Sequence, residues 1–315
     1  MSGPLDPMIE KYMALNGSFK KKLIFRFGDG AGFFSEFNNL VFAVLYCLDA
    51  GYRFSLYSPH DGTLAIRKGW DDYFLPFCEQ VDEEFHKENN ERFLMGKIAA
   101  STRIRRWLYK KKNDFDYYTY ELWDRFRSDD FSGKLFDIRE LGIRGDFLGS
   151  ASLVADMLWR YEPSFGDMVR ERIDALALPE PYVGLHIRGG DKVTESQLFE
   201  PEEYMELLKA RSSARNVFVL TDDYRNIVKL RTDYPEYSFY TMCSEAEYGY
   251  DFSEFQKKGK GEQQGEYAKL LASVEILRRA RISFGSYKTN PGMYLGMTMR
   301  DRFVGIDSDR WLLKW

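Results

Sequence analysis

Residues 182–192 read YVGLHIRGGDK, a short run of strand-forming residues followed directly by two glycines and a charged pair. Side chains alternate along a strand, so the three aliphatic residues fall on one face while His186 and Arg188 fall on the other. In an open α/β sheet, ligands bind just beyond the carboxyl ends of the strands. An imidazole and a guanidinium at such an end, beside glycines that allow a close backbone approach, predict a site for a phosphate-bearing ligand. An arginine held in a structural salt bridge is the alternative.

The segments around this stretch alternate regularly between strand and helix patterns. Alternation at this spacing predicts right-handed crossovers and a parallel, doubly wound sheet. The further strands are expected at 216–220, 237–241 and 281–285, and the helices at 201–210, 223–231 and 267–279.

Two more strand ends carry polar residues that suit the same site. After 281–285 the chain reads SYKTNP, which predicts a helix capped by Asn290, with Thr289 and Asn290 lining an anion site at the helix N-terminus. Plain capping without a ligand is the alternative. After 216–220 come Asp222 and Asp223, which either cap the next helix or hold a basic residue of the first loop.

The N-terminal half opens with the same kind of pattern. A strand at 23–27 is followed by the glycine turn GDGAG at 28–32, a helix that Ser35 caps and Gly51 ends, and a strand at 53–57. The fold class is therefore α/β, with two Rossmann-like doubly wound halves.

The simplest partition is an N-terminal domain at 18–165 with helical cover, a C-terminal nucleotide-binding domain at 166–305, and a tail at 306–315. Residues 253–265, rich in lysine and glycine, are expected to form a mobile loop.

Composition narrows the function classes. The formal charge of −4 over 315 residues argues against bulk electrostatic binding to nucleic acid. Three separated cysteines offer neither a disulfide framework nor a zinc ribbon, and no stretch approaches the ~18 apolar residues of a membrane span. A cytoplasmic protein is expected, with a piece of a luminal protein as the alternative.

Two features of the middle of the chain stand apart. Aromatic residues make up 17% of the chain and suit either core packing or stacking on sugars. Residues 97–112 carry seven basic side chains and no acidic one. A solvated helix face explains them, and a dock for an anionic acceptor or a membrane surface is the alternative.

A resemblance to a known family begins at His186 and runs to Met205. The residues there, HIRGGDKVTESQLFEPEEYM, are similar to the motif HVRRTDK…F-x-P-x-EEYM of the core α1,6-fucosyltransferases and the rhizobial nodulation fucosyltransferases. TDD at 221–223 and SYKTN at 286–290 follow in the order that this family uses. The glycine turn at 28–32 also resembles the N-terminal one of the family.

This resemblance implies a GT-B fold, in which two Rossmann-like domains face a cleft and the C-terminal one holds a GDP-sugar donor. It implies that His186 contacts guanine and that Arg188 holds the β-phosphate, with Lys192 and Glu195 joining Arg188 in catalysis. The implied donor-binding residues are His186, Arg188, Gly189, Asp191, Asp222, Asp223, Ser273, Thr289, Asn290 and, from the N-terminal turn, Gly30.

Three positions depart from the family pattern. Gly189 stands where the family has a second arginine, and Ser196 stands where a glutamate helps to activate the acceptor, with Glu195 one position away. Ser273 stands where an aspartate reads guanine, with Glu275 two positions on. The phosphate site is thus better specified than the selectivity for base and sugar.

The implied reaction is the transfer of fucose from GDP-fucose to a hydroxyl of a glycan acceptor, with inversion, in glycan biosynthesis. Arg188 and the helix N-terminus at 289–290 would stabilise the departing GDP, and the three histidines have no metal-ligand spacing, so neither a metal nor a cofactor is expected. Glu195 is the first candidate for the base, and Asp71 and Asp72 are the next candidates.

Rival readings remain open. The turn at 28–32 is a poor dinucleotide fingerprint, because its third glycine comes early and Asp49, the candidate ribose carboxylate, falls inside a predicted helix. An inactive sugar- or nucleotide-binding module of the same fold, or a transferase for another nucleotide sugar, fits the three departures. Some aromatic residues of the middle are expected to stack on sugar, from the set Trp70, Tyr73, Trp107 and Tyr118.

Overall fold

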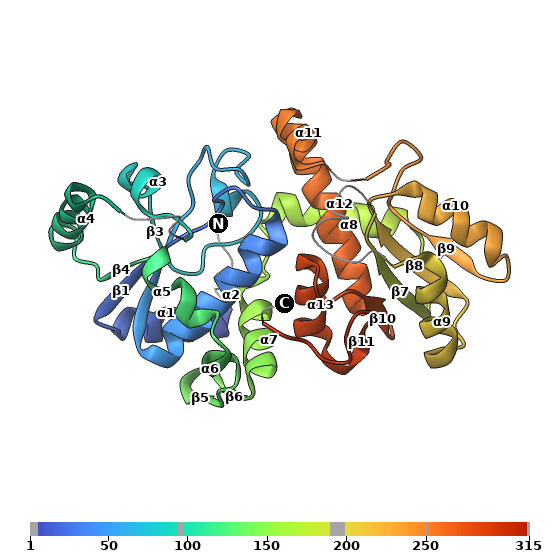
Figure 1. Ribbon diagram of the computed structural model, residues 1–315, viewed down its shortest axis with the longest axis horizontal. Coiled ribbons are helices and arrows are strands. Elements are labelled where there is room, and N and C mark those ends of the chain that lie inside the picture. Colours follow the sequence, from blue (N-terminus) through green and yellow to red (C-terminus); the bar gives the residue numbers. More distant parts are fainter. Residues whose placement is uncertain (1–5, 94–97, 190–198, 250, 314–315) are drawn as a thin grey trace. The chain divides into compact units, whose positions relative to one another are not determined.

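The computed structural model describes residues 6–93, 98–189, 199–249 and 251–313. The chain divides between Glu162 and Pro163 into two compact units, each built around its own parallel sheet (Figure 1).

The first unit contains a parallel sheet in the order β3-β2-β1-β4 and a small antiparallel pair, β5-β6. Helix α2 packs on β1 and β2 and is itself covered by α7. The elements are α1 (Pro7–Ser18), β1 (Lys21–Arg26), α2 (Phe33–Ala50), β2 (Tyr52–Tyr57), a 3₁₀ turn (Gly69–Asp72), β3 (Glu79–Val81), α3 (Phe85–Asn89), α4 (Ala100–Lys112), β4 (Tyr117–Tyr118), α5 (Thr119–Phe126), α6 (Asp129–Ser132), β5 (Phe136–Ile138), a 3₁₀ turn (Arg139–Leu141), β6 (Ile143–Gly145) and α7 (Phe147–Leu158).

The start of α2 differs from the sequence-based expectation. Its N-cap is Gly32 and not Ser35, whose hydroxyl instead accepts a hydrogen bond of 2.9 Å from the Arg92 guanidinium. The predicted end is confirmed, because Gly51 follows the helix in the left-handed conformation with φ +67°.

The aromatic surplus of the first unit is mostly core. Trp70, Tyr73 and Tyr118 are fully buried, so these three are excluded from the set of four that was predicted to include sugar-stacking residues. Trp70 donates from its indole nitrogen to the Leu75 carbonyl, and the Tyr73 hydroxyl donates to the Leu64 carbonyl, so each polar handle is satisfied inside the core. Of the four candidates only Trp107 is exposed, on α4.

The second unit contains a five-stranded parallel sheet in the order β11-β10-β7-β8-β9. Helices α9 and α10 pack on one face, and α12 packs on the other beside α8 and α13 (Figure 1). The elements are α8 (Pro163–Ala175), β7 (Tyr182–Ile187), α9 (Pro201–Arg211), β8 (Asn216–Thr221), α10 (Tyr224–Asp233), β9 (Ser238–Tyr240), α11 (Phe252–Lys257), α12 (Lys260–Arg279), β10 (Ser283–Gly285), α13 (Asn290–Met299), a 3₁₀ turn (Arg300–Arg302) and β11 (Phe303–Gly305).

Strand β7 lies at the centre of this sheet and is buried along its whole length. Val183, Leu185 and Ile187 belong to the core that α9 and α10 complete. The alternate residues face α12, because a side chain added at Gly184 would lie 2.5 Å from Leu277 of that helix. The predicted alternation is therefore confirmed, and it places His186 on the α12 face.

Residues 253–257 belong to α11 and 260–265 belong to α12, with only Lys258 and Gly259 between them, so the predicted loop is wrong. Asp251 caps α11 by accepting hydrogen bonds from the backbone of Ser253 and Glu254, and the buried Gln263 side chain holds the join between α11 and α12 through backbone carbonyls. Lysines that suggested a flexible segment form ion pairs along these helices, such as Lys258 with Glu266. Across the described residues no helix has the length and apolar content needed to cross a membrane.

Candidate functional site

The strand order of the second unit reverses between β7 and β10. From β7 the chain proceeds outward through β8 and β9, and then returns to add β10 and β11 on the other side. Ligands of open α/β sheets bind beyond the carboxyl ends of the strands at such a reversal. Here His186 and Gly285 lie side by side, since a Cβ built on Gly285 would be 3.1 Å from that of His186.

The end of β7 holds two buried polar atoms without a protein partner among the described residues: Nδ1 of His186 and Nε of Arg188. Burial and the neighbouring Arg188 cation lower the pKa of His186 to about 3. The imidazole is therefore neutral near pH 7 and offers one donor and one acceptor nitrogen. Buried polar groups are usually hydrogen-bonded, so these two atoms mark a place suited to a polar ligand.

Acidification tests the burial of His186. Its folded pKa of about 3 lies below the unfolded value of 6.5, so the unfolded chain binds the extra proton between these values and stability falls as the pH falls. We expect His186 to contribute a loss of about 2 kcal/mol in unfolding free energy between pH ~6.5 and ~5. In urea unfolding measured over this range, His186→Gln should have a flatter pH dependence than the wild type. Parallel curves would contradict the burial.

The paired aspartates at the end of β8 organise the loop after β7. Asp222 accepts a 2.6 Å hydrogen bond from the backbone N–H of Gly189, and Asp223 caps α10 while pairing with Arg225. A Cβ at Gly189 would lie 2.5 Å from that of Asp223, so the close approach of the two strand ends requires glycine. The aspartates thus hold the backbone of the first loop, where the sequence suggested a basic side chain, and Asp223 performs the capping role.

The loop after β10 is fixed by a carboxylate that sequence reasoning missed. Asp307 follows β11 and accepts hydrogen bonds from the Ser286 hydroxyl at 2.6 Å and from the backbone of Tyr287 at 3.0 Å and of Lys288 at 3.1 Å. The signal was present, because Asp307 follows a short apolar strand as Asp222 does. The prediction of a tail at 306–315 does not place Asp307 at a strand end and is wrong at this residue.

Helix α13 begins immediately after this loop, one residue earlier than expected. The N-cap is Thr289, whose hydroxyl accepts from the Gly292 N–H at 3.1 Å, so the prediction of Asn290 as the cap is wrong. Asn290 is the first helical residue and is exposed. The positive end of α13 still lies at the carboxyl edge of β10, where it suits an anion.

Taken together, these strand ends suit an anionic ligand. The Asp222, Asp223 and Asp307 carboxylates are all bound to backbone groups or to Arg225. Arg188 and the α13 terminus supply positive charge, and the planar guanidinium matches the oxygens of a diphosphate.

The remaining donor candidates are placed only in part. Ser273 is buried on α12 and donates its hydroxyl to the Lys269 carbonyl of the same helix. Asp191, Lys192 and Glu195 lie outside the described residues, so their roles stay predictions. Within the described ranges no cluster of three histidine, cysteine or acidic side chains is placed to hold a metal ion.

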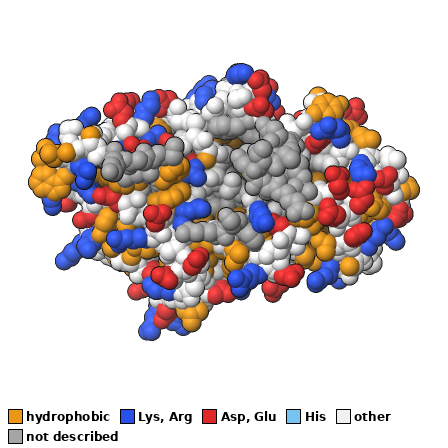
Figure 2. All heavy atoms as spheres, viewed as in Figure 1, with side chains coloured by type: hydrophobic (Ala, Val, Ile, Leu, Met, Phe, Trp, Pro, Cys, Tyr) orange, Lys and Arg blue, Asp and Glu red, His pale blue; other side chains and the backbone are white. Residues whose placement is uncertain are grey.

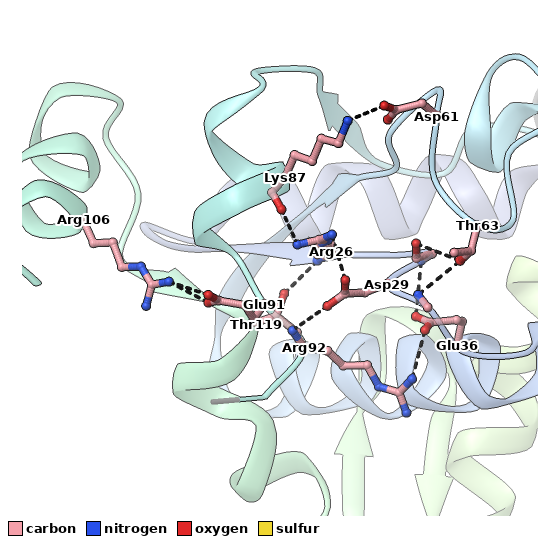
Figure 3. A network of polar contacts seen from close by, with 12 residues as sticks. Arg26, Asp29, Glu36, Asp61, Thr63, Lys87, Glu91, Arg92, Arg106 and Thr119 are labelled. Atoms are coloured by element: carbon pink, nitrogen blue, oxygen red, sulfur yellow. Dashed lines mark hydrogen bonds and ion pairs between the residues drawn. The ribbon is translucent and has the colours of Figure 1, made fainter. Parts of the chain in front are cut away.

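The N-terminal glycine turn belongs to the first unit, whereas the residues described above belong to the second. Gly28 and Gly30 have φ near +84° and +83°, and the Gly30 N–H donates to the Thr63 hydroxyl. The turn is tied to a polar network in which Arg92 pairs with the buried Glu36 (Figure 3). Gly30 thus has a local structural role, and its predicted contact with a donor stays untested.

The carboxylates named as second candidates for the catalytic base have structural partners. Asp72 accepts three backbone hydrogen bonds, each of 2.8 Å, from Ile66, Arg67 and Lys68, and Asp71 accepts one from Gln80. Asp49 lies inside α2 and pairs with Lys134, which does not suit a ribose contact.

Comparisons with known proteins agree with this geometry. Residues 150–250 match the model of a family described as "Alpha-(1,6)-fucosyltransferase N- and catalytic domains". The matched range includes β7, α9, β8 and α10, which build half of the site.

Solved structures give the fold. NodZ alpha-1,6-fucosyltransferase soaked with GDP-fucose has a TM-score of 0.51 at 15% identity, over 89% of this chain and 92% of that one. POFUT1 in complex with GDP has a TM-score of 0.45 at 14% identity, over 90% and 97%, and an Arabidopsis thaliana FUT1 variant with GDP has 0.48 at 13%, over 94% and 74%. The similarity to NodZ confirms the predicted α/β fold of GT-B type.

Proposed function

We propose that this chain is a glycosyltransferase that moves fucose from GDP-fucose to a hydroxyl of a glycan acceptor. The observation that carries the proposal is the pair of buried nitrogens of His186 and Arg188 at the strand reversal, next to the start of α13, for which the described part of the chain offers no hydrogen-bond partner. The family match over residues 150–250 and the NodZ-like fold support it, since that NodZ structure was soaked with GDP-fucose.

The proposed step is a displacement at the anomeric carbon. The bond from this carbon to the β-phosphate oxygen breaks, a bond to the acceptor oxygen forms on the opposite face, and the hydroxyl proton passes to a base. Charge grows on the departing GDP, and Arg188 with the positive end of α13 is placed to stabilise it. These groups support a reaction that inverts the anomeric centre and needs no metal. Glu195 is our candidate for the base.

Neutral His186 suits the nucleobase better than the phosphates. Its pKa of about 3 leaves the imidazole uncharged, so it offers directional hydrogen bonds without attracting anions. The close packing at Gly189 also means that this position has no room for the second arginine that the family carries there. We therefore propose that Arg188 provides the main phosphate contact from β7.

A donor screen tests the proposal. We expect GDP and GDP-fucose to raise the melting temperature of the full chain, with no effect of EDTA, and GDP-fucose to be hydrolysed faster than GDP-mannose or UDP-sugars. Release of the nucleoside diphosphate is the measured quantity, and it reports on base and sugar selectivity together.

Each alternative predicts a different pattern in the same screen. Stabilisation by NAD and not by GDP would overturn the proposal in favour of a dinucleotide enzyme. Binding of GDP without hydrolysis of any donor, and without transfer to a glycan panel, would identify an inactive binding module. Turnover that EDTA abolishes would contradict the metal-independent mechanism alone.

A further inference from the structure

Helix α4 has an apolar face that points to solvent. Ile104, Trp107 and Leu108 are 60%, 56% and 55% exposed. They lie three and four residues apart, a spacing that brings them to one side of a helix. Scattered exposed apolar residues are ordinary, but three adjacent large ones on one helix face form a patch that calls for an explanation.

The opposite face of α4 is polar and packs against neighbouring residues of the first unit. Arg106 is the buried residue of this helix, and its guanidinium makes two 2.7 Å hydrogen bonds to the Glu91 carboxylate. Its carbonyl accepts from the Tyr118 hydroxyl, and Tyr109 stacks on Phe85 with ring centres 3.6 Å apart. These contacts fix the rotation of the helix, so the usual arrangement of a surface helix, apolar inward and charged outward, is inverted.

Basic residues flank the apolar face on both sides, and Lys111, four residues after Trp107, extends from its C-terminal end. At about 100° per residue, Arg103 and Lys110 fall beside Trp107, while Arg105 and Lys112 fall beside Leu108. No acidic residue occurs between Ala100 and Lys112. Figure 2 shows hydrophobic and basic side chains gathered side by side over α4.

An apolar groove adjoins this face. It has a volume of about 620 Å³, and its lining residues, which combine an apolar floor with two cations, are Phe85, Ser101, Ile104, Arg105, Leu108, Tyr109 and Lys112. The Arg105 guanidinium lies 5.2 Å above the Phe85 ring, which holds the cation at the border of the apolar floor.

We propose that α4 is a membrane-contact helix that lies flat on an anionic lipid surface. The apolar residues would enter the boundary between headgroups and acyl chains, and the flanking cations would meet the lipid phosphates. Trp107 at the edge of the apolar arc suits the headgroup level. This charge pattern is complementary to a bilayer with anionic lipids, and it accounts for both the outward apolar face and the surplus of basic residues.

Vesicle sedimentation with the full chain tests this helix. We expect binding to vesicles of equal parts phosphatidylcholine and phosphatidylglycerol, weakened by salt, and little binding to phosphatidylcholine alone. Ile104→Ser/Trp107→Ser/Leu108→Ser should abolish binding. Arg105→Gln/Lys112→Gln should weaken it about 30-fold, at about fivefold for each charge removed.

Matched controls come from the same unit. Leu135→Ser removes an apolar side chain that is 77% exposed, and Arg139→Gln/Arg144→Gln removes two exposed cations, and both variants should bind vesicles like the wild type. The melting temperature of every variant checks folding, and the shift caused by GDP should persist because the donor residues lie in the second unit.

Three results would overturn the proposal of a membrane-contact helix. Vesicle binding by the α4 triple variant equal to that of the Leu135 control would overturn the proposal, as would an absence of binding to anionic vesicles. A dimer in sedimentation velocity that the triple variant dissociates would show that a second copy covers this face, and would also overturn it.

Discussion

Replacing Arg188 with alanine is expected to abolish the stabilisation of the chain by GDP and to lower donor turnover by about 10²–10³-fold. The guanidinium follows the central strand β7, and position 189 next to it is closed to a larger side chain, because a Cβ there would lie 2.5 Å from that of Asp223. A diphosphate would therefore lose its main cation from β7. In the wild type, GDP at about 100 times its Kd should stabilise by about 2.7 kcal/mol, and the variant should show none of this.

Two further variants distinguish the effects of the charge and of the planar geometry of Arg188 from a general loss of stability. Arg188→Lys keeps the charge and loses the planar fork, so we expect partial recovery of GDP binding with slower turnover. Arg170→Ala removes an arginine that is 69% exposed on α8 of the same unit, and it should leave both quantities unchanged. A GDP-dependent thermal shift of wild-type size in Arg188→Ala would contradict the assignment of this residue to the phosphates.

The strand ends of the second unit could be predicted because two short-range signals coincide there. The expected strand at 182–187 agrees with β7 residue for residue, since a buried central strand is a continuous apolar run bounded by proline and glycine. The topology of an open α/β sheet then makes the residues that follow β7 and β8 site candidates. Asp222 binds the backbone of Gly189, a pairing between loops that no local pattern specifies.

The edge of the sheet was harder to predict. Strand β11 has three residues, Phe303–Gly305, too few for periodicity to stand out. Without a recognisable strand, the sequence gives no reason to place Asp307 at a strand end, and the carboxylate that fixes the Ser286 loop falls in the predicted tail. In the structure, Trp311 donates to the Met293 carbonyl of α13, so this end of the chain is packed on the site helix.

Aromatic residues posed a different problem, because composition does not say which face a side chain takes. Trp70 and Trp107 look equally suited to sugar stacking in the sequence, yet one is fully buried and the other is 56% exposed. The tertiary contacts of the two residues distinguish them. Trp70 packs against Phe37 of α2, which comes from a distant position in the chain, while the orientation of α4 is set by the ion pair between Arg106 and Glu91.

Replacing Gly292 with alanine is expected to cost about 3 kcal/mol of unfolding free energy and to abolish GDP binding. A Cβ at this position would lie 1.8 Å from the Ser286 carbonyl oxygen and 2.7 Å from the Thr289 hydroxyl. The Ser286 carbonyl cannot move away easily, because Asp307 anchors the loop through three hydrogen bonds. The start of α13 must move instead, which breaks the cap between Thr289 and Gly292 and displaces the positive end of the helix.

Two controls separate steric overlap from a general effect of the substitution. Gly261→Ala, near the start of α12, meets no atom within 4 Å, so it should be neutral or should stabilise by up to ~1 kcal/mol through helix propensity. Thr289→Ala removes the cap without creating an overlap, so it should lower the unfolding free energy by about 1 kcal/mol. GDP should still bind to this variant, but more weakly than to the wild type. Urea unfolding and titration with GDP measure both quantities. If Gly292→Ala unfolds and binds GDP like the wild type, α13 is not held against the Ser286 loop, and its positive end does not contribute to the anion site.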